Sequence, residues 1–146
     1  MDGSKKTPFE KIGGRPVIEK VTKAFYDRVY RHPWIGQYFA NIPQEHIENQ
    51  QTDFMQGAFR GKRIYSGRMP ADAHMHMVIN DELFDLRNRL LKEAMDEVGV
   101  AQEMQDLWLS IDEAFRKVLV KDAASARPRY RTDEILNFLP NGKAAS

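Results

Sequence analysis

The chain of 146 residues contains no cysteine, which excludes disulfide bonds, thiolate metal ligands and cysteine nucleophiles. It also lacks an excess of charge of one sign, since 22 basic and 21 acidic side chains leave a formal net charge of +1. A nucleic acid is therefore not an expected partner. No apolar run approaches the roughly 20 residues of a membrane-spanning helix, and the polar beginning does not resemble a secretory signal. We expect a cytoplasmic protein that binds neither nucleic acid nor membrane.

The motifs of several common enzyme classes are missing as well. The chain has no glycine-rich phosphate loop, no His-Glu-x-x-His zinc motif and no Gly-x-Ser-x-Gly nucleophile turn. Carboxylates are numerous, but their spacing assigns them to solvated helix faces. The length and an apolar share of 42% suit one globular domain with a hydrophobic core.

Apolar residues recur three and four positions apart through most of the chain, which predicts helices and no strands. Thr7-Pro8-Phe9-Glu10 has the pattern of a capping box at a helix start. The predicted helices cover residues 8–12, 15–31, 43–59, 70–77, 81–98 and 104–118, with a short turn or helix at 34–39 and a long loop at 60–69. Residues 1–121 form the predicted all-α domain. Residues 122–146 are a C-terminal extension, with a linker and a short helix around 132–139.

Two polar side chains fall on or beside apolar helix faces. Gln51 comes four residues after Ile47 and three before Phe54, so it shares their face. An unpaired amide in such a place costs roughly 1–3 kcal/mol, so it either bonds a backbone carbonyl or faces a polar guest in a pocket. Tyr26 lies next to the apolar stripe of its own helix and leaves the same two alternatives. Together the two side chains would offer neutral donors to one small polar ligand.

The two histidines of the predicted helix at 70–77 do not share a face. At a separation of two residues, His74 and His76 point roughly 200° apart on a helix, which argues against a metal site held by both. A single inward histidine beside Ala73 and Met77 is either a core residue or an axial ligand of haem iron.

Several motifs follow one order along the chain: Phe25-Tyr26, Phe39, Gln50-Gln51, Tyr65-x-Gly67, His74 with Ile79 after it, and Phe84-Asp85. This ordered set resembles the group I truncated haemoglobins, the two-over-two globins, across roughly residues 8–120. The resemblance implies a two-over-two helical sandwich around haem b and its iron. One departure concerns the second double glycine of the family, because Arg60-Gly61 keeps only one glycine.

The resemblance also implies roles around the haem. His74 would be the proximal iron ligand, and Tyr26 and Gln51 the distal hydrogen-bonding pair. Gln50 stands where some relatives carry a histidine as sixth ligand, so we expect water or an open position there. The expected haem contacts are Phe39, Ile47, Phe54, Tyr65, Ile79, Phe84 and Arg68, with Arg63 as an alternative to Arg68 near a propionate.

By the same resemblance the expected function is reversible binding of dioxygen, with carbon monoxide and nitric oxide as further ligands. The oxygen would be stored, scavenged or transported. An enzymatic alternative, nitric oxide dioxygenation, would need an external reductase because the chain has no flavin or nicotinamide site. A gas sensor would use residues 122–146 as its output. The alternative without haem is a helical interaction module in which Tyr26 and Gln51 are paired in the core.

Overall fold

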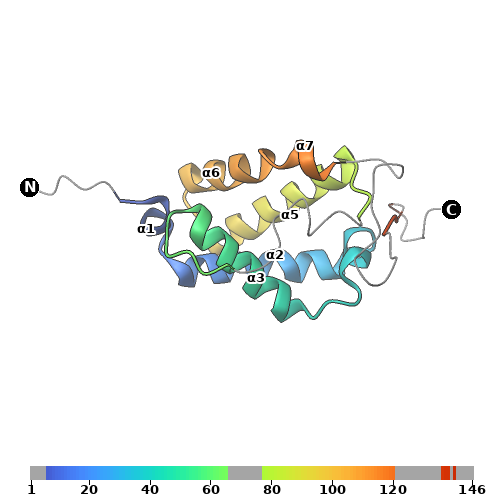
Figure 1. Ribbon diagram of the computed structural model, residues 1–146, viewed down its shortest axis with the longest axis horizontal. Helices are drawn as coiled ribbons and strands as arrows, with labels where there is room; N and C mark the ends of the chain where they lie inside the picture. Colours follow the sequence, from blue (N-terminus) through green and yellow to red (C-terminus); the bar gives the residue numbers. More distant parts are fainter. Residues whose placement is uncertain (1–5, 66–76, 121–135, 139, 141–146) are drawn as a thin grey trace, which may run out of the picture.

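The computed structural model describes residues 6–65, 77–120, 136–138 and 140 (Figure 1). Within these ranges the all-α prediction is confirmed, and the only β-pairing is one isolated bridge. The helices are α1 (Pro8–Ile12), α2 (Arg15–Arg31), the 3-10 helix η1 (Ile35–Phe39), α3 (Gln44–Ala58), α5 (Asp81–Val98), α6 (Gln102–Glu113) and α7 (Arg116–Leu119). None of these described helices combines the length and the apolar character needed to cross a membrane.

Local sequence sets several helix ends. Thr7 Oγ1 accepts a hydrogen bond from the Glu10 N–H at 3.2 Å, and the Glu10 carboxylate accepts one from the Thr7 N–H at 3.1 Å, which is the predicted capping box. Asn80 caps α5, because its Oδ1 accepts from the Leu83 N–H at 2.8 Å. Gly99 ends the same helix in the left-handed conformation, with φ at 86°.

The central helix is α2, which packs against both α3 and α5, while α5 also contacts α6. Figure 1 shows α6 and α7 running along α5, with α2 and α3 on the other side of the molecule. Between α2 and α3 the contact includes a polar pair. Thr22 Oγ1 donates to the Glu19 carbonyl, so the buried Thr52 hydroxyl is the donor in the 2.8 Å bond between Thr22 and Thr52. This two-over-two arrangement is the predicted one.

The helix predicted over 104–118 is divided in two, which corrects the expectation from spacing. α6 ends at Glu113 and α7 begins at Arg116, with a turn at 114–115 between them. Arg116 forms ion pairs with Glu113 and with Asp81 and Asp85 of α5. These contacts depend on which helices lie side by side, so helical periodicity alone does not reveal the break.

Residues 136–138, in the predicted C-terminal extension, are not helical. Leu136 forms a parallel bridge with Met77, and the Phe138 carbonyl accepts a hydrogen bond from Trp34 Nε1 at 2.7 Å. The short helix predicted there is therefore wrong for these three residues, because their backbone groups pair with distant segments instead of with one another. The helix predicted at 70–77 lies outside the described residues except for its last position.

Candidate functional site

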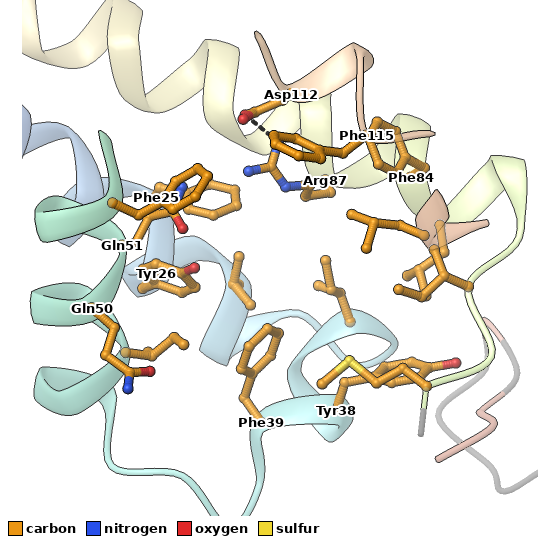
Figure 2. Close-up of a pocket in the computed structure, with 18 of the residues that line it drawn as sticks. Phe25, Tyr26, Tyr38, Phe39, Gln50, Gln51, Phe84, Arg87, Asp112 and Phe115 are labelled. Atoms are coloured by element: carbon orange, nitrogen blue, oxygen red, sulfur yellow. Dashed lines mark hydrogen bonds and ion pairs between the residues drawn. The ribbon is translucent and has the colours of Figure 1, made fainter. Parts of the chain in front are cut away.

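A cavity lies between α2, η1, α3, α5 and the end of α6 (Figure 2). Segments from both halves of the chain form its wall, so it exists only in the folded molecule. The residues expected from the sequence that line it are Tyr26, Phe39, Ile47, Gln50, Gln51, Phe54, Tyr65, Ile79 and Phe84. His74 and Arg68 lie outside the described residues, and their roles stay predictions.

Aromatic side chains make up much of the wall. The rings of Tyr26 and Phe39 meet nearly edge-on, with centroids 5.9 Å apart. On the α3 side Phe54 contacts Tyr65 at 5.4 Å and Phe115 at 6.0 Å. Edge-to-face contacts of this kind hold rings in fixed orientations, so the wall is preformed and apolar.

Tyr26 and Gln51 come from α2 and α3, and both line this cavity (Figure 2). Tyr26 is 6% exposed, and burial raises the pKa of its hydroxyl far above the usual value, against the opposing charge of Arg87. The hydroxyl is therefore a neutral donor at physiological pH. Within the described part of the chain, neither this hydroxyl nor the Gln51 amide has a hydrogen-bond partner. The alternative in which Tyr26 and Gln51 form hydrogen bonds within the protein core is therefore not supported by the described residues.

An ion pair in the wall was not predicted from the sequence. Arg87 of α5 and Asp112 of α6 both line the cavity, and Arg87 Nη1 lies 2.6 Å from Asp112 Oδ2. Asp112 is 5% exposed, which corrects the expectation that the carboxylates lie on solvated faces. The signal that could have found Arg87 is its spacing, since it follows Phe84 by three residues on the same helix.

Eight uncharged residues of the wall were also missed as site residues. They are Phe25, Val29, Ile35, Tyr38, Met77, Leu83, Phe115 and Leu119. Phe115 belongs to the turn between α6 and α7, so its position depends on the break that periodicity did not reveal. Tyr38 donates from its hydroxyl to the Val78 carbonyl at 3.0 Å, which directs that polar group away from the centre of the cavity.

The residues present fit a haem. A preformed apolar wall can pack against a flat apolar cofactor such as haem. A few polar groups in that wall can form hydrogen bonds with a small ligand bound beside the cofactor. The deciding observation is the Tyr26 hydroxyl, because it belongs to a buried side chain that lines the cavity, has no partner among the described residues and can donate a hydrogen bond to a guest. Gln51 offers a second donor from the facing helix.

Known proteins share this architecture. The group 1 truncated haemoglobin of Tetrahymena thermophila is 32% identical over 98 residues, which are 67% of this chain and 81% of that protein. The crystal structure of truncated haemoglobin from Tetrahymena pyriformis, in its Fe(III) form, matches with a TM-score of 0.72 at 26% identity and covers 80% of this chain and 100% of that one. The two-over-two haemoglobin of Synechococcus, in the cyanomet state with covalently attached haem, matches with a TM-score of 0.71 at 26% identity, over 78% and 98% of the two chains.

The family model for bacterial-like globins matches residues 7–120. This range contains every residue that lines the cavity, from Phe25 to Leu119. The helical arrangement and the order of the motifs agree with the match. The chain therefore belongs to the bacterial-like globin family and, within it, to the group I truncated haemoglobins.

Proposed function

We propose that the protein holds haem b in this cavity, with His74 as the proximal iron ligand, and that it binds dioxygen reversibly. The observation that carries the proposal is the pair of donors from Tyr26 and Gln51, which line an apolar cavity without a described protein partner. The haem supplies an iron position at which a diatomic gas is held. Carbon monoxide and nitric oxide would enter the same space.

Tyr26 and Gln51 would select among these gases by charge. Dioxygen in such a site carries partial negative charge, whereas carbon monoxide stays nearly neutral. A hydrogen bond to a charged partner contributes roughly 1.5–3 kcal/mol, which is about tenfold to a hundredfold in a dissociation rate. The burial of Tyr26 keeps its proton on the hydroxyl, so the group is always available as a donor. We therefore expect tight dioxygen binding and slow release.

The first experiment tests the cofactor and its ligand. Purified protein is mixed with hemin and dithionite, and the absorption spectrum is compared for the wild type, His74→Ala and His76→Ala. A stoichiometric Soret band that shifts or weakens only in His74→Ala is expected, because the helix predicted over residues 70–77 would turn His76 away from the face of His74. The absence of a Soret band in the wild type would remove the proposal.

Replacing Tyr26 by phenylalanine tests the distal pair. Tyr26→Phe is expected to speed dioxygen release by about tenfold to a hundredfold and to change carbon monoxide release little. Stopped-flow displacement of each gas measures the two rates. Tyr30→Phe is the matched control, because the Tyr30 hydroxyl lies one turn further along α2 and donates to the Ile42 carbonyl at 2.8 Å. Equal acceleration of both gases in Tyr26→Phe would exclude a hydrogen-bond mechanism.

A further inference from the structure

The segment 77–79 connects the part of the sequence that contains His74 to α5. Its three residues are not helical, and Asn80 then caps α5. Met77 and Ile79 line the cavity and are 5% and 8% exposed. Because a segment without helical hydrogen bonds must pair its backbone groups elsewhere, its position depends on contacts with other parts of the chain.

Both backbone polar groups of Val78 bind distant residues. The Val78 N–H donates to the Leu136 carbonyl at 2.8 Å, and the Val78 carbonyl accepts from the Tyr38 hydroxyl at 3.0 Å. Leu136 also forms a parallel bridge with Met77. Neither hydrogen bond is local in the sequence, so the tertiary structure fixes the backbone of this segment through two separate parts of the chain.

The Tyr38 hydroxyl joins these two parts to each other. It accepts a hydrogen bond from the Phe138 N–H at 3.1 Å, and the two rings meet edge-on with centroids 5.1 Å apart. Trp34 Nε1 donates to the Phe138 carbonyl at 2.7 Å. Burial raises the pKa of the Tyr38 hydroxyl, against the hydrogen bonds of Phe138 and Trp34. The hydroxyl therefore keeps the proton that it donates to Val78.

This restrained backbone is close in the chain to the proposed iron ligand. His74 lies outside the described residues, but it precedes Met77 by three residues, and three peptide units span at most about 11 Å. A restraint on Met77 and Val78 therefore limits the positions that are open to His74. The bond between a metal and an imidazole depends on the orientation of the ring, which groups outside the metal site help to fix.

We propose that Tyr38 and residues 136–138 form a clamp on the backbone of Val78, which positions His74 on the haem iron. Tyr38 is then a positioning residue for gas binding, because its hydroxyl points away from the centre of the cavity and acts through His74 (Figure 2). The inference rests on the proposed function, in which His74 holds the iron. It goes beyond that function because residues 136–138 lie outside the globin match.

The first test measures the bond between iron and His74 in the full, haem-loaded chain. Resonance Raman spectroscopy of the ferrous protein without gas gives the iron–histidine stretching band. Tyr38→Phe keeps the ring and removes the hydroxyl, so both of its hydrogen bonds are lost. The band is expected to shift and broaden, because the backbone no longer holds His74 in one orientation. Transfer of haem to an excess of a haem-free acceptor globin should be about tenfold faster, the effect of one to two ordinary hydrogen bonds.

Gas release separates this effect from that of the distal donors. A change at the proximal ligand acts on the iron and therefore on every gas that binds it. Tyr38→Phe is expected to change dioxygen and carbon monoxide release by similar factors, whereas Tyr26→Phe is expected to change mainly dioxygen release. A change confined to dioxygen in Tyr38→Phe would contradict the clamp.

Tyr30→Phe is the matched control. The Tyr30 hydroxyl also donates to a backbone carbonyl, that of Ile42 at 2.8 Å, but it does not contact the segment 77–79. This variant should keep the wild-type band and the wild-type haem transfer rate. A merely structural role of Tyr38 would lower the free energy of unfolding and leave the band and the gas release rates unchanged, which would overturn the proposal. Equal band shifts in the two variants would overturn it as well.

A second pair of variants tests residues 136–138, and it remains decisive if Tyr38→Phe does not fold. Phe138→Ala and Phe138→Pro both lose the ring, but only proline also lacks the N–H that Tyr38 accepts. Both variants keep the carbonyl that accepts from Trp34. Phe138→Pro is expected to shift the iron–histidine band more than Phe138→Ala does. Equal bands in the two variants would overturn the clamp.

The outcomes distinguish this inference from the proposed function. A wild-type iron–histidine band in Tyr38→Phe and Phe138→Pro, each with a full Soret band, would overturn the clamp and leave the haem assignment intact. A Soret band that is unchanged in His74→Ala would overturn both proposals, because the clamp acts through that residue.

Discussion

Arg60 has a backbone conformation that is strained for a residue with a side chain. Its φ is 69°, in the left-handed region, and it lies just after α3. The resemblance to truncated haemoglobins leads one to expect a second glycine here, of which the chain keeps only Gly61. A Cβ at Gly61 would lie 2.7 Å from Phe9 Cδ1, so the glycine that is kept is required by packing. The lost one is replaced by an exposed arginine that tolerates the strain.

Restoring glycine at this position is expected to stabilise the protein. Arg60→Gly removes the strain of a residue that has a side chain and a left-handed backbone conformation. Glycine also gives the unfolded chain more freedom, which offsets part of this gain. The free energy of unfolding should therefore rise by up to about 1 kcal/mol. Urea denaturation measures it. Lys62→Gly, at an exposed neighbour without positive φ, should instead lower the stability. A loss of stability in Arg60→Gly as large as that in Lys62→Gly would contradict this explanation.

At the scale of a single element, the C-terminal end of α2 depends on an unprotonated histidine. His32 caps the helix, and its Nδ1 accepts a hydrogen bond from the Trp34 N–H at 3.1 Å. Imidazole nitrogen accepts only when it carries no proton. Burial, and then the charge of Arg89, hold the pKa of His32 below its ordinary value of 6.5. The cap therefore connects the end of α2 to η1 only in the neutral form.

This cap predicts a pH dependence with a definite sign. The unfolded chain takes up the proton at a higher pH than the folded one, so the contribution of His32 is present above pH 6.5 and is lost as the pH falls below it. His32→Asn keeps an acceptor without a titrating proton. Wild-type stability should therefore fall relative to His32→Asn over that range, measured by urea denaturation at a series of pH values.

A matched histidine variant controls for other titrating groups. His46 is exposed on α3, and His46→Asn should leave the wild-type pH dependence unchanged. The explanation fails if His32→Asn and wild type lose stability in parallel as the pH falls.

At the scale of the whole molecule, residues 136–138 pack against the end of the cavity. Tyr38, which lines the cavity, accepts a hydrogen bond from the Phe138 N–H at 3.1 Å, and the two rings meet edge-on at 5.1 Å. Trp34 Nε1 donates to the Phe138 carbonyl, and the Val78 N–H donates to the Leu136 carbonyl at 2.8 Å. Figure 1 shows this segment, in red, near the loop that carries η1. Three residues outside the globin match thus cover part of the globin domain.

Deleting residues 122–146 is expected to destabilise the domain. Trp34 and Tyr38 are buried and would lose partners for polar groups, and a lost partner costs roughly 1–3 kcal/mol, so we expect a decrease of about 2 kcal/mol in the free energy of unfolding. Phe138→Ala keeps the backbone bonds and removes the ring, so its loss should be smaller. Denaturation curves of the three proteins measure the difference.

The same deletion bears on the sensor hypothesis. A changed dioxygen release rate in the deleted chain would link the extension to gas binding through Tyr38. An unchanged stability, within about 0.5 kcal/mol, would show that the contact of Phe138 with the domain contributes nothing measurable. An unchanged release rate would remove this contact as a route for signalling.

Much of the fold and part of the site could be predicted because they follow local rules. Periodicity and caps placed α2 and α5 within a residue or so of their observed ends. The same spacing put Gln51 on an apolar face, where the structure has it lining the cavity. These features depend on contacts between residues three or four positions apart on one helix. Such contacts can be inferred from the spacing of residues along the sequence.

The features of the fold and the site that the sequence did not predict depend on which helix faces pack against each other. The spacing from Phe84 could have placed Arg87 on the cavity face of α5, but only the packing of α5 beside α6 brings it together with Asp112. The extended pairing of Leu136 with Met77 likewise joins segments far apart in the chain. The sequence by itself determined α2 and α5, their apolar faces and the family pattern of the site. Only the tertiary structure decided which charges are buried there, because burial depends on the partner surface and not on the residue type.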